Sequence, residues 1–155
     1  MYLYGDDAYA RTTALREKII VPYLAKHQEG SVTRFYLGDE GAFLKLREFT
    51  GTGSLFAKVK LVILYEISEL DVKFDKECTA FLKTLLEDKS TTVVIVADKK
   101  LPKVYDFLLK EPVKSYEFEP LTGAKFVNFL KKEVSSQKLT VSDSAISQVA
   151  SLHDG

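Results

Sequence analysis

Five short apolar or aromatic runs, separated by helical patterns, restrict the fold of this chain more than any other feature of its sequence. The runs are Tyr2–Tyr4, Thr33–Leu37, Leu61–Tyr65, Thr92–Ala97 and Ser115–Phe118. Continuously apolar runs are typical of strands that are buried on both faces, and intervening helices can connect parallel neighbours. The sequence therefore predicts an α/β fold, a five-stranded parallel sheet with flanking helices.

The clearest helical pattern lies between the third and fourth runs, from about Asp75 to Glu87. One apolar face of this helix would carry Phe74, Cys78, Phe81, Leu82 and Leu85. This spacing matches the helical repeat. We therefore interpret Cys78 as a core residue and not as a nucleophile.

The first helix is expected to begin near Asp7, whose carboxylate can accept hydrogen bonds from free backbone amides. Leu15, Ile19 and Leu24 would form its inner face. Pro22 should kink or end this helix early, because proline has no backbone donor.

The pattern changes after Pro120. Thr122 can open one helix, and Ser142 can cap another that carries Ile146 inward. Two helices without a following strand predict a second, helical domain. We expect an α/β domain over residues 1–119 and the beginning of a helical domain over residues 120–155, in a chain cut from a longer protein.

Composition excludes several classes of function. Lysine and arginine number 22, as do aspartate and glutamate, so no overall charge favours nucleic acid or an anionic membrane. Cys78 is the only cysteine, and His27 and His153 are far apart, which argues against disulfides and zinc. The apolar runs are too short to span a bilayer, and no signal peptide opens the chain. We expect a cytoplasmic protein without a metal.

The loop after the first run, YGDDAYARTT, has the spacing of a phosphate-binding P-loop. Such a loop needs a second glycine, a lysine and a hydroxyl residue at the positions that Ala10, Arg11 and Thr12 occupy here. Only Gly5 and Thr12 match, and the adjacent aspartates place negative charge where a triphosphate would lie. Nucleotide binding is expected to be weak or absent.

The acidic motif that accompanies a working P-loop is also incomplete. At the end of the third run, Tyr65 stands where a metal-holding carboxylate would be, and only Glu66 remains. Two independent elements of hydrolysis are thus damaged, which argues for a lost activity.

Paired aspartates after a first strand also occur in phospho-accepting receiver domains. Those domains need an aspartate at the end of strand three, where Tyr65 lies, and Asp71 is beyond the expected turn. We therefore interpret Asp6 and Asp7 as the start of a helix, where the helix dipole favours negative charge.

The segment TGTGSLFA, from Thr50 to Ala57, is the second unusual stretch. Ser54 can cap a short helix whose first turn carries Leu55 and Phe56. This apolar pair can belong to the core, as most such pairs do. A glycine-flanked tip is also suited to an anchor that enters a partner's pocket.

Two small groups of lysines, Lys99–Lys100–Lys103 and Lys131–Lys132, are interpreted as solvated helix faces rather than a track for phosphates. Direct contact with DNA by the complete protein stays open.

Several segments together resemble the delta subunit of the bacterial DNA polymerase III clamp loader, over nearly the whole chain. They are YLYGDD, SLFAKVKLVILYE, TTVVIVADKK, and YEFEPLTGAKFVNFLKKEV with LTVSDSAISQVASL. Their order and spacing are more specific than any single segment.

The resemblance implies an AAA+-like fold with an inactive nucleotide site, followed by a helical lid domain whose beginning is residues 120–155 and a collar domain that is absent here. In that family a leucine–phenylalanine pair enters a hydrophobic pocket of the ring-shaped beta sliding clamp. This role passes to Leu55 and Phe56, with Ser54 before them.

By the same resemblance, the protein would be a non-catalytic subunit of the DNA polymerase III holoenzyme, a DNA-directed DNA polymerase complex. It would bind the beta sliding clamp and help to open it for loading onto primed DNA, without a cofactor of its own. Its other partners would be the gamma/tau and delta prime subunits, and DNA would be reached only through the assembled complex. An active P-loop ATPase and a nucleic-acid-binding module are the alternatives.

Overall fold

The computed structural model of this chain describes residues 1–51, 59–71 and 74–153. The chain divides into two compact units, Met1–Phe118 and Glu119–Gly155, which are described separately.

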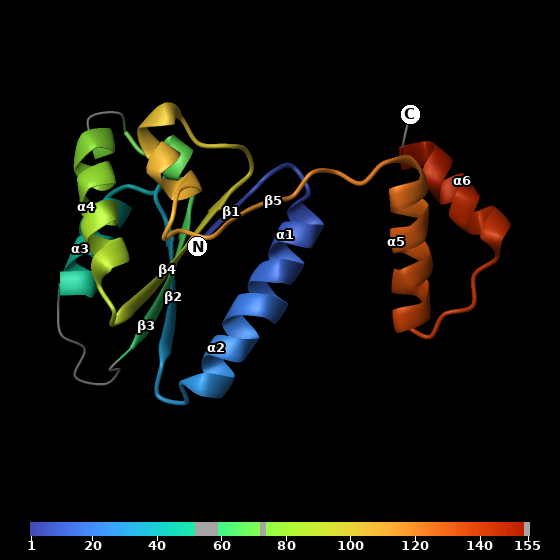
Figure 1. The fold of residues 1–155 in the computed structure, drawn as a ribbon, viewed down its shortest axis with the longest axis horizontal. Coiled ribbons are helices and arrows are strands. Elements are labelled where there is room, and N and C mark those ends of the chain that lie inside the picture. Colours follow the sequence, from blue (N-terminus) through green and yellow to red (C-terminus); the bar gives the residue numbers. More distant parts are fainter. Residues whose placement is uncertain (52–58, 72–73, 154–155) are drawn as a thin grey trace. The chain divides into compact units, whose positions relative to one another are not determined.

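A five-stranded sheet forms the centre of the first unit (Figure 1). Its strands are β1 (Tyr2–Tyr4), β2 (Ser31–Tyr36), β3 (Lys60–Tyr65), β4 (Thr91–Ala97) and β5 (Ser115–Glu117). They lie in the order β2-β3-β4-β1-β5, and every neighbouring pair is parallel. The predicted α/β fold with a five-stranded parallel sheet is confirmed.

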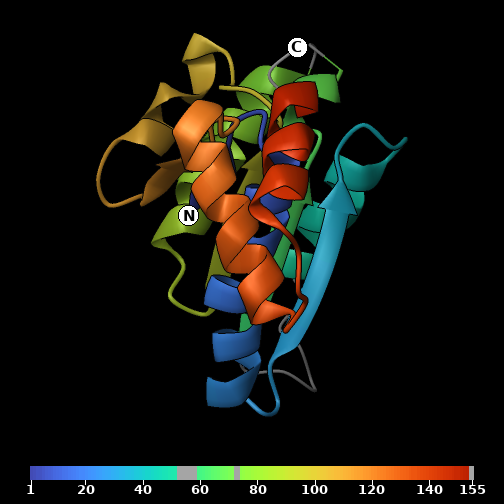
Figure 2. The ribbon, with the colours of Figure 1, turned by 90° about the vertical axis from the view of Figure 1, so that its right-hand side faces the viewer.

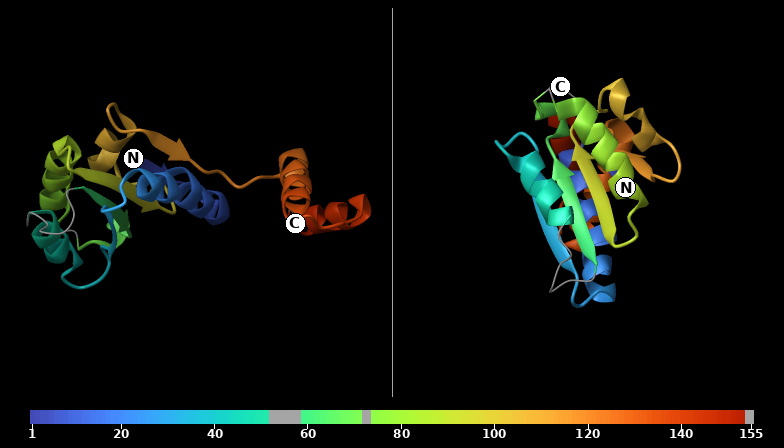
Figure 3. Two further views of the ribbon diagram at one scale, coloured as in Figure 1. Left: turned by 90° about the horizontal axis from the view of Figure 1, so that it is seen from below. Right: turned by 90° about the vertical axis from the view of Figure 1, so that its left-hand side faces the viewer.

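Helices cover both faces of this sheet (Figure 3). On one face lie three consecutive helical segments: α1 (Ala8–Ala14), the π-helical η1 (Leu15–Ile20) and α2 (Val21–Lys26). On the other face lie α3 (Ala42–Gly51), α4 (Asp75–Glu87) and the 3₁₀ segment η4 (Lys103–Leu109), and a short 3₁₀ turn, η2 (Ile67–Glu69), follows β3. Strands β3 and β4 are buried at nearly every position, because both of their faces are covered.

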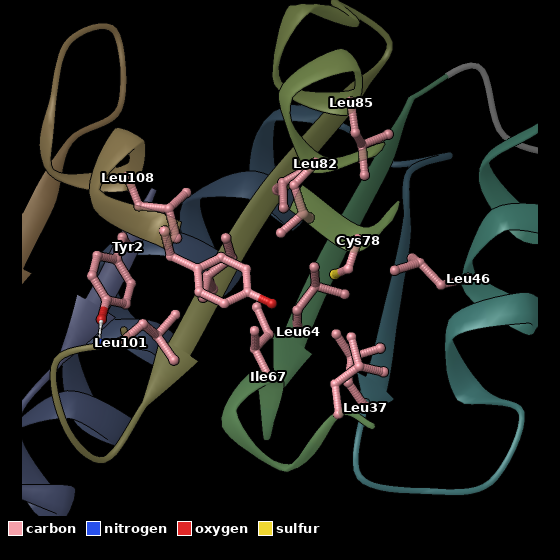
Figure 4. Close-up of a cluster of buried hydrophobic side chains, with 14 of the residues drawn as sticks. Tyr2, Leu37, Leu46, Leu64, Ile67, Cys78, Leu82, Leu85, Leu101 and Leu108 are labelled. Atoms are coloured by element: carbon pink, nitrogen blue, oxygen red, sulfur yellow. Dashed lines mark hydrogen bonds between the residues drawn. The ribbon is translucent and has the colours of Figure 1, made fainter. Parts of the chain in front are cut away.

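The larger hydrophobic core lies between the sheet and the α3, α4 and η4 side (Figure 4). From α4, Cys78, Leu82 and Leu85 enter this core, as the helical spacing predicted. Phe43 of α3 meets the ring of Phe81 edge-on, with 5.8 Å between the ring centroids. A smaller core between the sheet and the α1–η1 side includes Leu3, Leu15, Ile19, Leu61, Ile63, Val94 and Val96.

The sequence predicts that Pro22 kinks or ends the first helix, and the structure shows that the helix does not end there. Helical backbone continues to Lys26, and a π-helical stretch lies just before the proline, where the amide of Val21 bonds to the carbonyl of Arg16. This wider turn accommodates a residue without an N–H and rotates the residues that follow it. Leu24, expected on the inner face, is therefore 45% exposed.

The second unit contains α5 (Gly123–Ser136) and α6 (Asp143–His153), which pack side by side (Figure 2). Ile146 and Ala150 of α6 are buried. The hydroxyl of Ser142 accepts a 3.2 Å hydrogen bond from the amide of Ala145, so the predicted cap of α6 is present. The Nζ of Lys131 lies 2.8 Å from the Asp143 carboxylate at the start of the same helix.

Within residues 1–51, 59–71 and 74–153, no helix is long and apolar enough to cross a lipid bilayer.

Candidate functional site

The loop between β1 and α1 depends on a glycine at position 5. Gly5 has a φ of +121°, and a Cβ built there would lie 2.3 Å from the carbonyl oxygen of Phe118, just after β5. The amide of Asp7 donates to the same oxygen at 3.0 Å. The backbone at the end of β5 therefore contacts the loop directly, and there is no space for a side chain at position 5.

Three backbone amides at this turn are already hydrogen-bonded within the chain. The amide of Asp7 is bonded to Phe118, the amide of Ala8 donates to the Asp6 carbonyl at 3.0 Å, and the amide of Ala10 donates to the Asp7 carboxylate at 2.8 Å. A phosphate cradle works because such amides are free to point at the ligand. Here the Asp7 side chain, the predicted helix cap, takes the place that an anion would need.

Arg11 is the most unusual side chain of the site, because its charged group is almost fully buried. The side chain is 8% exposed. One guanidinium nitrogen donates to the carbonyl of Gly5 and another to the carboxylate of Asp98, while Nε has no hydrogen-bond partner among the described residues. Gly5 follows β1 and Asp98 follows β4, so Arg11 ties together the ends of two adjacent strands.

A pocket of about 610 Å³ opens beside Arg11 at the carboxyl ends of the strands, where ligands bind in open α/β sheets. Thr12, Glu66 and Asp98 are among the residues that line it. Glu66 has left-handed backbone angles, with φ of 57° and ψ of 35°, which is rare for a residue with a side chain. The pocket is therefore lined by residues from both candidate nucleotide motifs, Thr12 and Glu66, and by the Arg11–Asp98 ion pair.

Tyr65, which stands at the position of the metal-holding carboxylate, stacks on Tyr36 of the neighbouring strand. Their ring centroids are 5.0 Å apart, and the rings are 12° from parallel. Burial is the main reason that the pKa of Tyr65 is raised, and the charges of Arg34 and Arg11 partly oppose this shift. A phenol that stays protonated at neutral pH is a poor ligand for magnesium.

The structure brings together four of the residues that the sequence analysis placed in the nucleotide motifs: Arg11, Thr12, Tyr65 and Glu66 all line the pocket. Gly5 lies in the adjacent turn, where its carbonyl accepts a hydrogen bond from Arg11. Ala10 lies in α1, where its amide donates to the Asp7 carboxylate. The predicted clamp-binding residues Ser54, Leu55 and Phe56 lie outside the described residues.

Sequence reasoning missed Asp98, the partner of Arg11. A usable signal was present, because Asp98 directly follows a buried strand in TVVIVAD, and carboxyl ends of parallel strands meet at one edge of a sheet. Lys99 and Lys100 were expected on a helix face. They instead line the pocket from the loop between β4 and η4.

Proteins of known structure share this fold. The delta protein of the Bacillus subtilis DNA clamp loader superimposes on 94% of this chain with a TM-score of 0.54 and 17% identity, over 45% of its own length. The chain has the fold of a clamp-loader subunit. Saccharomyces cerevisiae RIF2 also shares the fold, with a TM-score of 0.50 and 13% identity over 97% of this chain and 62% of RIF2.

A curated relative was found at the level of sequence. The Replication factor C large subunit of Nanoarchaeum equitans is 25% identical over 97% of this chain. The chain spans about a third, 34%, of the length of that relative. No protein-family model matches the sequence.

Within this clamp-loader fold, the candidate site consists of the Arg11–Asp98 ion pair and the pocket beside it. Among residues 1–51, 59–71 and 74–153, no group of three or more histidine, cysteine, aspartate or glutamate side chains is placed to hold a metal ion.

Proposed function

We propose that this chain is the nucleotide-independent, clamp-binding part of a clamp-loader subunit similar to the delta subunit. In this role it binds the ring-shaped beta sliding clamp and helps to open it for loading onto primed DNA, inside a cytoplasmic DNA polymerase III holoenzyme. The second unit, residues 119–155, would be the beginning of a helical lid domain.

The observation that carries this proposal is that, within a clamp-loader fold, the groups of the loop between β1 and α1 that could bind a phosphate are already bonded to the chain itself. The side chain at the lysine position, Arg11, is bonded to Gly5 and Asp98, and the Asp7 carboxylate occupies the amide of Ala10. A subunit with such a site does not need ATP to hold its shape. Its work is binding, and ATP hydrolysis belongs to partner subunits of the gamma/tau type.

The clamp contact is assigned to Ser54, Leu55 and Phe56 by the resemblance of the SLFAKVKLVILYE segment to the delta subunit. In the chain, α3 ends at Gly51 and β3 begins at Lys60, so the segment lies between a surface helix and a strand inside the sheet. Burying a leucine and a phenylalanine supplies about 3–6 kcal/mol before ordering costs, at ~25 cal/mol per Å². The clamp opens only if its open state binds these residues better than its closed state.

The test is binding of the nucleotide-free chain to the beta sliding clamp, measured by surface plasmon resonance or calorimetry. Leu55→Ala and Phe56→Ala should each weaken binding at least tenfold, since hot-spot truncations cost about 2 kcal/mol or more. Leu44→Ala is the matched control, because Leu44 is 54% exposed on α3 and outside the proposed contact. Equal binding by all four proteins would contradict the assignment of the contact.

The two alternative functions predict other outcomes. A working ATPase would gain thermal stability from ATP with magnesium, and Thr12→Ala would abolish the gain. A nucleic-acid module would bind primed DNA without partners, with an affinity that falls steeply as salt rises. We expect neither result.

A further inference from the structure

The pocket beside Arg11 has an arrangement of charge that the proposed clamp contact does not explain. Among the described residues, its lining includes three cations, Arg11, Lys99 and Lys100, and three carboxylates, Glu66, Glu69 and Asp98. Buried arginines serve proteins chiefly as partners of carboxylate and phosphate oxygens. Here the oxygen that Arg11 contacts belongs to the chain itself.

Arg11 and Asp98 differ sharply in burial. The Arg11 side chain is 8% exposed, whereas the Asp98 side chain is 87% exposed. The exposed carboxylate thus covers the guanidinium from the solvent side. A second acceptor, the Gly5 carbonyl, holds the same guanidinium on the side of the loop.

The position of Asp98 is set by a buried anchor in β1. The amide of Leu101 donates a 2.9 Å hydrogen bond to the hydroxyl of Tyr2, and that hydroxyl lies 3.5 Å from the carbonyl oxygen of Lys99. The Tyr2 side chain is 1% exposed. The short segment that carries Asp98 is therefore tied to the strand beside it, so the carboxylate is held near Arg11 by the fold.

We propose that the Asp98 carboxylate acts as an internal ligand of Arg11. The carboxylate occupies a guanidinium nitrogen that would otherwise bind an anion, and it thereby keeps the pocket closed to phosphate-type oxyanions. This inference does not depend on the proposed clamp contact. Removing the Asp98 charge leaves the buried guanidinium with the Gly5 carbonyl as its remaining acceptor among the described residues. It also leaves three cations facing two carboxylates in the lining. Both changes favour the entry of an oxyanion.

The test measures binding of inorganic phosphate by the whole chain, by calorimetry and by thermal unfolding, with ionic strength matched by sodium chloride. We expect Asp98→Ala to bind phosphate at least tenfold more tightly than the unchanged chain. Glu69→Ala, which removes a carboxylate from the same pocket without touching the ion pair, should change the affinity less than threefold. The double variant Arg11→Met with Asp98→Ala should lose the gain.

Three results would overturn the proposal: no gain in a folded Asp98→Ala variant, an equal gain in Glu69→Ala, or a gain that survives in the double variant. Asp98→Asn provides a second measurement, because the amide keeps the shape and an oxygen acceptor but not the charge. It should bind phosphate more tightly than the unchanged chain and less tightly than Asp98→Ala. If Asp98→Ala does not fold, an Asp98→Asn affinity equal to that of the unchanged chain also rejects the inference.

Discussion

The ammonium group of Lys60, at the start of β3, donates a 2.7 Å hydrogen bond to the carbonyl oxygen of Phe49 near the end of α3. The same nitrogen lies 4.8 Å from the centroid of the Phe49 ring. Lys60 is only 7% exposed. This contact joins the last turn of α3 to the first residue of a central strand, where the helix dipole favours a cation.

Replacing Lys60 with methionine should lower the free energy of unfolding by about 1–3 kcal/mol. The variant keeps the apolar stem but removes the charged donor of a partly buried hydrogen bond. Urea unfolding followed by circular dichroism measures the change. Lys45→Met, at an exposed position of α3, should change stability by less than about 0.5 kcal/mol. Equal losses in the two variants would mean that the contact contributes nothing.

Gly5→Ala should destabilise the fold by at least about 2 kcal/mol more than Gly41→Ala. Both glycines have positive φ values, +121° and +72°, so both substitutions strain the backbone. Only at Gly5 does the new Cβ meet the Phe118 carbonyl at 2.3 Å, since no described atom lies within 4 Å of a Cβ at Gly41. Thermal unfolding of the two variants side by side isolates the steric cost. Similar melting temperatures would show that the end of β5 can move away from the loop.

Tyr2→Phe should cost about 1–3 kcal/mol of stability, because the amide of Leu101 loses its acceptor in a buried position. Tyr116→Phe is the control, since Tyr116 is 48% exposed on the edge strand β5. Hydrogen exchange should show the Leu101 amide less protected in Tyr2→Phe and unchanged in Tyr116→Phe. Retained protection would mean that another acceptor replaces the hydroxyl.

Stability should fall as pH rises from about 9 to about 11, in part through Cys78. Burial raises the pKa of the Cys78 thiol to about 11, from an ordinary value of 9.0. The hydrogen bond with Tyr105 lowers this pKa by a smaller amount, and the negative charge of Asp75 raises it. Between these values the unfolded chain releases the thiol proton and the folded chain keeps it, so unfolding is favoured.

The contribution of Cys78 is isolated by comparing the pH dependence of unfolding in the unchanged chain and in Cys78→Ala. The variant is less stable at neutral pH, since a buried sulfur is lost, but its stability should fall less steeply between pH 9 and 11. Parallel curves for the two proteins would contradict the raised pKa. In the folded chain, we also expect Cys78 to react with thiol reagents far more slowly than after denaturation.

Local patterns of the sequence were sufficient for most of the regular elements. The observed strand β1 has the predicted bounds, and α4 spans the predicted residues, because its apolar face repeats with the helical period over three turns. The exposure of Leu24 could not be predicted in this way. Its exposure follows from a π-helical stretch that local propensities do not indicate.

The sequence by itself determined that this chain folds around a parallel sheet and that its two nucleotide motifs are incomplete, since apolar runs and motif spacings are local properties. Only the tertiary structure decided which groups the loop after β1 contacts. Arg11 and Asp98 are 87 residues apart, and they meet because β1 and β4 are neighbours in the sheet. Likewise, Phe118 closes over Gly5 because β5 pairs with β1. Contacts between strand ends depend on strand order, which only the folded chain establishes.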